Sequence, residues 1–144
     1  MMKYYAYKPN LEELSCSIIS IELELGHNAD GIQTYINKLY ENASFVVAIN
    51  EQNAICGIVA FYDNNLVSKE AYISYIAVKN EYRNAGVGSI LLETMEQQVL
   101  SKGFNSIKLE VFNENYSAIS FYKKHHFTYH NKASKNSHYM LKYL

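Results

Sequence analysis

The chain lacks the features that mark membrane, nucleic-acid and metal proteins. No apolar run approaches the length of a membrane span, and the first residues, Met-Met-Lys-Tyr-Tyr, contain no apolar signal core. The net charge is −1 and no basic run stands out, which argues against a nucleic-acid partner. Cys16 and Cys56 show no metal-ligand spacing, so we predict no metal and two buried free thiols in a reducing compartment. These absences predict a soluble cytoplasmic protein.

Tryptophan is absent as well, whereas the chain contains 14 tyrosines. We expect most of these phenols to lie between core and solvent, with a few lining a polar pocket. Of the 144 residues, 49% are hydrophobic, which is enough for a packed core and argues against disorder. Repeats and domain linkers are missing too. We therefore expect one domain over residues 1–144.

Hydrophobic periodicity predicts a mixed α/β fold with helices on both sides of a sheet. The predicted strands are residues 3–8, 44–49, 54–62, 70–78, 106–112, 127–130 and 139–143. The predicted helices are residues 11–25, 30–41 and 87–102, and a last helix that opens at 113–115 and runs to about 125. The strand at 54–62 is apolar on both alternating sets of positions, which is typical of a strand covered on both faces.

The stretch from Ile76 to Gly88 has the order strand, loop, helix. Gly86 and Gly88 lie at the helix start, where unpaired N–H groups and the positive end of the dipole can hold an anion. Arg83 adds a positive charge nearby. The loop lacks the Lys-Ser/Thr pair of a Walker motif and the third glycine of a dinucleotide fingerprint. By spacing alone, an ordinary turn with a surface arginine is the commoner interpretation of such a glycine pair.

The strand end Ile76-Ala77-Val78 followed by Tyr82-Arg83-x-x-Gly86-x-Gly88 resembles the acetyl-CoA site of the GNAT N-acetyltransferases. A second motif strengthens the resemblance: a strand reading Leu-Glu-Val precedes a helix with matching residues at Asn115, Ala118, Phe121, Tyr122 and Phe127. Together the two motifs cover about residues 70–127. The resemblance implies a mixed, mostly antiparallel central sheet and acetyl-CoA as co-substrate. It assigns cofactor binding to Ile76, Ala77, Val78, Arg83, Asn84, Ala85, Gly86, Val87, Gly88, Ser89 and Asn115.

Tyr122 and Glu110 are the predicted catalytic residues. Asn115 and Tyr122 are two helical turns apart, about 10 Å along one face, so a pantetheine arm could contact both. Tyr122 would then protonate the leaving thiolate, whose thiol has a pKa of about 8.5. The competing interpretation makes Tyr122 an aromatic packing residue beside Phe121. Glu110 is the candidate base for the acceptor amine, and it also fits a strand residue paired with Lys108.

Other groups could serve as the base. Glu22 and His27 in the N-terminal part are alternatives, whereas His125, His126 and His138 fit surface or capping positions better. Three positions depart from the family pattern, with Asn80 in place of Pro, Asn84 in place of Gly and His126 in place of Gly. These departures leave the acetyl-CoA motif intact and make the subfamily undetermined.

The acceptor is predicted to be a primary amine of a small molecule, such as an amino sugar, an amino acid or a polyamine. A protein N-terminus or lysine is the alternative acceptor, and a CoA-binding module without turnover is the alternative from another class. An intact glycine loop together with Tyr122 favours an enzyme over such a module. The oligomeric state stays open, with a homodimer among the possibilities.

Overall fold

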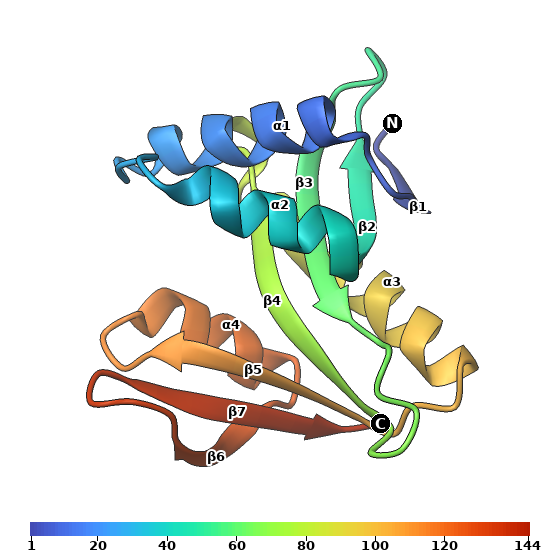
Figure 1. The fold of residues 1–144 in the computed structure, drawn as a ribbon, viewed down its shortest axis with the longest axis vertical. Helices are drawn as coiled ribbons and strands as arrows, with labels where there is room; N and C mark the ends of the chain where they lie inside the picture. The colour runs from blue at the N-terminus through green and yellow to red at the C-terminus, as the bar shows by residue number, and fades with distance from the viewer.

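The computed structural model describes residues 1–144 and consists of a seven-stranded sheet with four α-helices (Figure 1). The strands are β1 (Lys3–Ala6), β2 (Ser44–Ile49), β3 (Ile55–Tyr62), β4 (Glu70–Val78), β5 (Ser106–Phe112), β6 (Thr128–Lys132) and β7 (Ser137–Tyr143). The helices are α1 (Leu11–Glu24), α2 (Ile32–Asn42), α3 (Val87–Ser101) and α4 (Tyr116–Lys124), with a 3-10 turn, η1, at Asn80–Tyr82.

The strands lie in the order β1-β2-β3-β4-β5-β7-β6. Every neighbouring pair is antiparallel except β4 and β5, which are parallel. The predicted mixed, mostly antiparallel sheet is therefore confirmed. The last two strands are longer than predicted, and the loop between them is shorter. They form a hairpin that turns at residues 133–136.

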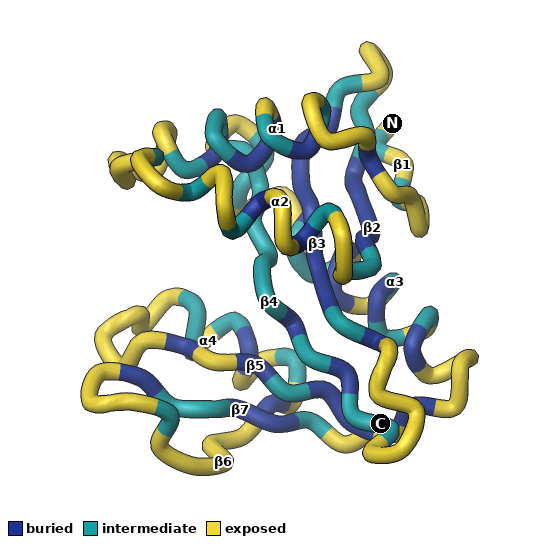
Figure 2. Tube along the Cα trace, in the orientation of Figure 1, coloured by how far each residue is buried: buried dark blue, intermediate teal, exposed yellow.

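Helices cover both faces of the sheet. Helices α1 and α2 pack on one face, where Leu14, Ile18 and Ile36 contact the β2–β3 hairpin. Helix α3 packs on the other face through Leu91 and Met95. Strand β3 lies between the two clusters and is buried along nearly its whole length, as predicted (Figure 2).

Gly57 of β3 allows α3 to approach the sheet closely. A Cβ atom at this position would lie 2.9 Å from Leu91 Cδ1, which is closer than real Cβ atoms approach, and 3.3 Å from Val87 Cγ1, which is tighter than most such contacts. Glycine therefore brings the first turn of α3 down onto β3. The helix start is thereby set beside the end of β4.

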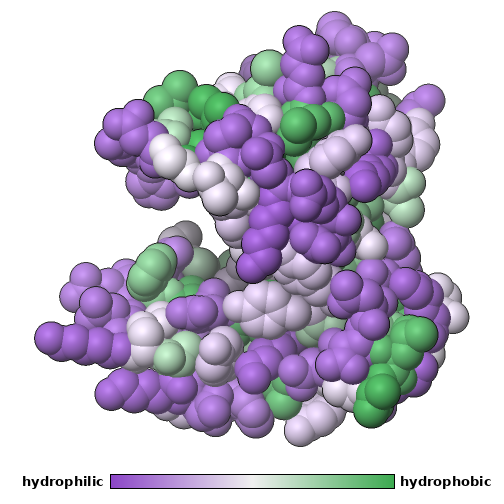
Figure 3. All heavy atoms as spheres, in the orientation of Figure 1, coloured by the Kyte–Doolittle hydropathy of each residue, from purple (hydrophilic) through white to green (hydrophobic).

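Strands β4 and β5 separate after a short paired segment. Their last pair is Ile73 with Leu109, although β4 continues to Val78 and β5 to Phe112. The two free strand ends diverge, and in the space-filling view a notch opens between the α1–α2 part and the part built from α4, β5 and β7 (Figures 1 and 3). This divergence leaves one edge of β4 unpaired from Ser74 onward.

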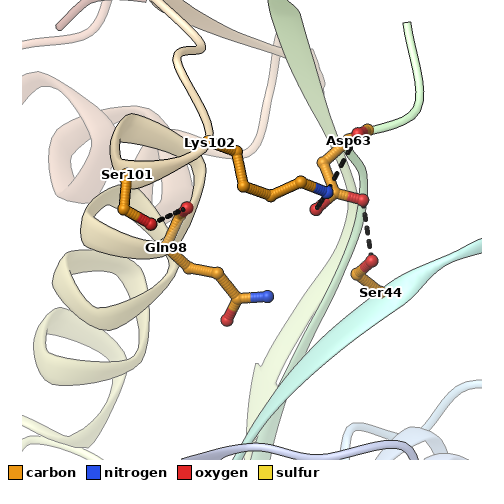
Figure 4. Close-up of polar contacts among 5 residues, drawn as sticks. All are labelled: Ser44, Asp63, Gln98, Ser101 and Lys102. Atoms are coloured by element: carbon orange, nitrogen blue, oxygen red, sulfur yellow. Dashed lines mark hydrogen bonds and ion pairs between the residues drawn. The ribbon is translucent and has the colours of Figure 1, made fainter. Parts of the chain in front are cut away.

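A polar cluster fastens the opposite, paired end of the sheet (Figure 4). The buried carboxylate of Asp63 follows β3 and accepts hydrogen bonds from Ser44 Oγ at 2.7 Å and from Lys102 Nζ at 2.7 Å. Lys102 lies at the C-terminal end of α3. The cluster therefore ties α3 to the β2–β3 hairpin, away from the notch.

The cysteine prediction was half right. Cys56 is buried in β3, whereas Cys16 lies on the exposed side of α1, so the expectation of two buried thiols was wrong for Cys16. The apolar segment around Cys16 is an amphipathic helix whose buried side is formed by Leu14, Ile18 and Ile21, and position 16 falls on the other side. No helix of the structure combines the length and the apolar character needed to cross a bilayer.

Candidate functional site

The loop between β4 and α3 presents a row of free amide groups. Residues Asn84 and Gly86 have positive φ angles, 62° and 82°, and turn the chain into the helix. None of the N–H groups from Asn84 through Ser89 donates a hydrogen bond to another part of the chain. These donors lie at the N-terminus of a 15-residue helix, where the dipole is positive. The arrangement is suited to an anion with several oxygen atoms, such as a pyrophosphate.

The two glycines of the loop differ in what surrounds them. A Cβ on Gly86 would meet nothing within 4 Å, so Gly86 is needed for its backbone conformation and leaves the outer side of the loop open. A Cβ on Gly88 would lie 3.5 Å from the ring of Phe121 and 3.8 Å from Val78 Cγ2. Both distances are ordinary van der Waals contacts, so the packing of α4 beside α3 does not itself require glycine at position 88. Val87 between them is buried in the core, and Ala85 is exposed.

Arg83 braces the end of β4. Its Nε donates to the carbonyl oxygen of Val78 at 3.0 Å, and Nη1 lies 3.4 Å from Asn80 Oδ1. The second terminal nitrogen of the guanidinium has no hydrogen-bond partner in the chain. Arg83 therefore holds the strand end in place and keeps one donor available beside the loop.

The free edge of β4 carries the peptide group of Ile76. Successive residues of an antiparallel strand direct their peptide groups alternately toward the partner and away from it. Lys79 donates its N–H to Cys56 of β3 at 2.8 Å, so Ala77 also faces β3, while Val78 and Ile76 face the edge that β5 has left. Arg83 occupies the carbonyl of Val78. Ile76 has no strand beside it on this edge.

Tyr122 is buried to 8% exposure in α4, between the rings of Phe121 and Phe127 at centroid distances of 5.4 and 5.7 Å. Burial raises the pKa of its phenol to about 12. The hydroxyl has no hydrogen-bond partner in the chain. Every fully enclosed side-chain oxygen of the structure has such a partner, so the hydroxyl oxygen of Tyr122 is not fully enclosed and contacts solvent. A packed ring with an outward hydroxyl satisfies both interpretations of Tyr122.

Asn115 is the N-cap of α4. Its Oδ1 accepts a hydrogen bond from the N–H of Ala118 at 3.2 Å, as the side chains of N-cap residues do. The amide nitrogen of the same side chain remains free. The predicted cofactor role would therefore use the nitrogen, since the oxygen is engaged.

Glu110 is exposed on β5, one residue past the last pair with β4. One carboxylate oxygen accepts a hydrogen bond from Ser137 Oγ at 2.6 Å, and the other has no partner. The expected pairing with Lys108 does not form, because Lys108 Nζ lies 4.3 Å from the centre of the Tyr139 ring. Burial, followed by the charge of Glu110, raises the pKa of Tyr72 to about 12.

Tyr72 is a residue that the sequence pattern did not single out. It lies on β4 opposite Lys108, on the same face of the sheet as Glu110, where the two strands begin to part. The only available signal was its place among the polar positions of an alternating strand. The phenol stays neutral far above physiological pH, so it can donate a hydrogen bond but does not act as a resting base.

The alternative bases lie together on the other side of the notch. Glu22 of α1 accepts a hydrogen bond from the hydroxyl of Tyr75 at 3.0 Å, and His27 Nδ1 lies 3.1 Å from its other oxygen. Burial, and then the charge of Glu22, raises the pKa of Tyr75. The other histidines are engaged elsewhere, with His125 Nε2 2.9 Å from Ser89 Oγ and His138 Nδ1 2.7 Å from Asn113 Oδ1.

Comparison with known proteins places this geometry in a family context. The family model described as the acetyltransferase (GNAT) family matches residues 13–127. Streptothricin acetyltransferase A of Bacillus subtilis is 31% identical over 99 residues, which is 62% of this chain and 57% of that protein. The chain spans between 26% and 57% of the length of the curated relatives that it matches.

Solved structures have the same arrangement of helices and strands. A GNAT-family acetyltransferase from Staphylococcus aureus Mu50 superposes with a TM-score of 0.84 at 21% identity, over 100% of this chain and 99% of that one. A second structure is a putative streptothricin acetyltransferase from Bacillus anthracis strain Ames in complex with acetyl coenzyme A. It superposes with a TM-score of 0.64 at 27% identity, over 72% of this chain and 63% of that one. The first likeness concerns the fold, and the second extends to a protein that binds the cofactor.

Proposed function

The chain belongs to the acetyltransferase (GNAT) family, and from this premise we propose that it transfers the acetyl group of acetyl-CoA to the primary amine of a small molecule. The observation that carries the proposal is the row of unpaired N–H groups from Asn84 to Ser89 at the start of α3. Any helix start leaves the four N–H groups of residues 86–89 unpaired, and here Asn84 and Ala85 extend the row, so that a pyrophosphate with its several oxygen atoms can accept from it. Arg83 supplies the neighbouring positive charge.

We place the pantetheine arm of acetyl-CoA, which carries the acetyl group, along the open edge of β4. The peptide group of Ile76 faces this edge and has a free N–H. Placed at the thioester, this donor stabilises the negative charge that develops on the carbonyl oxygen during amine attack. Val78 and Ala77 complete the strand on which the arm lies. The fixed amide supplies the polarising group in this proposal.

Tyr122 is the proposed acid. Its hydroxyl is protonated at physiological pH, as an ordinary phenol is, and burial raises its pKa further, to about 12. Its ring is held by Phe121 and Phe127. When the thioester C–S bond breaks, the phenol can donate to the departing sulfur and later recover the proton from water. The hydroxyl has no partner within the chain and is therefore available to a bound thioester.

Glu110 is the proposed base. An acceptor amine with a pKa near 10 enters mostly as an ammonium ion, so a proton has to leave before nitrogen attacks. Glu110 has one free carboxylate oxygen and no Lys or Arg partner, so its charge also attracts the cationic acceptor. Glu22 with His27 forms the alternative base on the opposite side of the notch.

The acceptor enters from the notch between the α1–α2 part and the β5–β7 part (Figure 3). A relative named for the small molecule streptothricin favours a small acceptor. The notch is open at the surface seen in Figure 3, which also favours testing a peptide N-terminus or a lysine side chain as the second candidate. The free hydroxyl of Tyr122 disfavours a module that binds CoA without turnover.

Two measurements test the proposal. Calorimetry with acetyl-CoA asks whether the cofactor binds, and release of the CoA thiol is then followed over a panel of amino sugars, amino acids, polyamines, N-terminal peptides and lysine peptides. We expect binding, and turnover with a small amine. Absence of acetyl-CoA binding would overturn the assignment, turnover restricted to peptides would replace the acceptor, and binding without any turnover would favour the module.

A further inference from the structure

Strand β4 contains a bulge at the point where it parts from β5. Tyr75 pairs with Ala60 of β3 and Ile73 pairs with Phe61, so Ser74 between them has no partner on β3. The last pair with β5 is also formed at Ile73. The peptide group of Ser74 therefore has no ladder partner on either neighbouring strand.

The bulge decides which way the rest of β4 faces. In a regular strand alternate side chains share a face, so Ile73 and Tyr75 would lie together and Ile76 would lie opposite them. In the structure Ile76 and Val78 pack toward α3 with Ile73, while Tyr75 packs toward α1 and α2. One inserted residue has shifted the register, which also turns the peptide group of Ile76 to the open edge.

Tyr35 of α2 holds this bulge. Its hydroxyl donates to the carbonyl oxygen of Ser74 at 3.0 Å and lies 2.7 Å from Ser74 Oγ. Burial raises the pKa of Tyr35 while the Ser74 hydrogen bond opposes the rise, so the phenol is a neutral donor at physiological pH. The carbonyl that the strands leave unpaired is thus satisfied by a side chain from a helix 39 positions earlier in the sequence.

We propose that Tyr35 is a positioning residue for acetyl transfer: by fixing Ser74 in the bulge, its hydroxyl sets the direction of the Ile76 N–H. This inference rests on the proposed function, which places the acetyl carbonyl at Ile76. Because Tyr35 belongs to the α1–α2 part of the notch, it links the acceptor side to the strand that carries the thioester. Its effect falls on the reaction step, since the pyrophosphate loop lies beyond the strand end.

The test compares Tyr35→Phe with a matched control, Tyr62→Phe. Tyr62 lies at the edge of the same hydrophobic cluster, and its hydroxyl forms no hydrogen bond in the chain. We expect Tyr35→Phe to lower kcat about tenfold, which is less than the loss caused by removing an oxyanion donor outright, because the Ile76 N–H is still present. The KM for acetyl-CoA and the Kd of CoA should stay within about twofold of wild type. Tyr62→Phe should keep both parameters. An unchanged kcat in Tyr35→Phe, or a loss of CoA affinity equal to the loss of kcat, would overturn the proposal.

Amide hydrogen exchange gives a readout that does not depend on activity. In the unliganded protein the N–H groups of Tyr75 and Ala77 face β3, and we expect them to exchange faster in Tyr35→Phe and at the wild-type rate in Tyr62→Phe. Unchanged exchange in Tyr35→Phe would show that the bulge holds without the hydroxyl and would overturn the inference. If wild-type protein fails to bind acetyl-CoA, the proposed function fails, and the exchange rates still decide whether Tyr35 holds the bulge.

Discussion

At the scale of single residues, one substitution of Tyr122 distinguishes a packing role of its ring from a catalytic role of its hydroxyl. Tyr122→Phe keeps the ring between Phe121 and Phe127 and removes only the hydroxyl. If the phenol protonates the leaving sulfur, kcat should fall by about a hundredfold while acetyl-CoA affinity stays the same. Steady-state kinetics and calorimetry measure the two quantities. A fall in kcat below about threefold would assign Tyr122 to packing alone.

Gly86 tests the anion loop. In Gly86→Val a β-branched side chain must adopt a φ of 82°, and it projects over the free amides, so CoA affinity should fall about tenfold or more. Gly103→Val is the matched control, because Gly103 also has a positive φ and open space around it but lies beyond the other end of α3. Calorimetry with CoA should separate the two variants. Equal affinities would mean that the phosphates bind elsewhere.

Glu110 is tested by its pH dependence. Glu110→Gln cannot accept the proton of the acceptor ammonium, so activity should fall most near neutral pH. It should recover toward pH 10, where an amine with a pKa of about 10 is already half deprotonated. The pH–rate profiles of wild type, Glu110→Gln and Glu22→Gln are to be compared. A wild-type profile in Glu110→Gln together with a changed one in Glu22→Gln would move the base to α1.

At the scale of helices and strands, the Asp63–Lys102 pair should contribute to stability and not to cofactor binding (Figure 4). Lys102→Met leaves the buried Asp63 carboxylate with Ser44 alone and should lower the free energy of unfolding by about 1 to 2 kcal/mol, a range reduced because the lysine is partly exposed. Ser101→Ala, at an exposed neighbouring position, is the control. Urea unfolding measures the stabilities. A large loss of CoA affinity in Lys102→Met would show that the Asp63–Lys102 pair also contributes to cofactor binding.

The sequence predicted elements well where the pattern is local. Runs rich in β-branched and aromatic residues gave the bounds of β2 and β4, and alternation gave those of β5. Asn10 and Asn115 marked the helix starts that they cap. The apolar positions of β4 change phase at Ser74, from Ala71 and Ile73 to Ile76 and Val78, but the tyrosines between them mask the change, and the bulge was not predicted. The early end of the β4–β5 ladder leaves no mark in the hydrophobic pattern of the strand. Both depend on partners far away in the sequence, such as Tyr35.

At the scale of the whole molecule, the two motifs identified the fold because together they specify β4, α3, β5 and α4, the elements that surround the diverging strands. The N-terminal part was less readable. Side-chain hydrogen bonds join the α1–α2 part to β4, from Tyr75 to Glu22 and from Tyr35 to Ser74, and such contacts between separate elements leave no periodicity in the chain. The proposed acceptor side of the site is built from these contacts, so the sequence contains no local pattern from which to predict the acceptor.

The tyrosines give the molecule a collective response to alkaline pH. Burial is the leading cause of a raised phenol pKa for Tyr35, Tyr62, Tyr72, Tyr75 and Tyr122, with values of about 12 for Tyr72 and Tyr122. Folding therefore favours the neutral phenols. Their contribution to stability is complete below the unfolded pKa of about 10 and is lost as pH rises from there toward the folded values.

We therefore expect the free energy of unfolding in urea to be level up to about pH 9.5 and to fall progressively above pH 10. The tyrosinate absorbance of the native protein should rise at higher pH than that of the urea-unfolded chain. Tyr62→Phe removes one partly buried phenol without breaking a hydrogen bond and should lose less stability over the same interval. Superimposable titrations of native and unfolded protein would contradict the burial of these phenols, because a phenol equally solvated in both states has no preference for one of them.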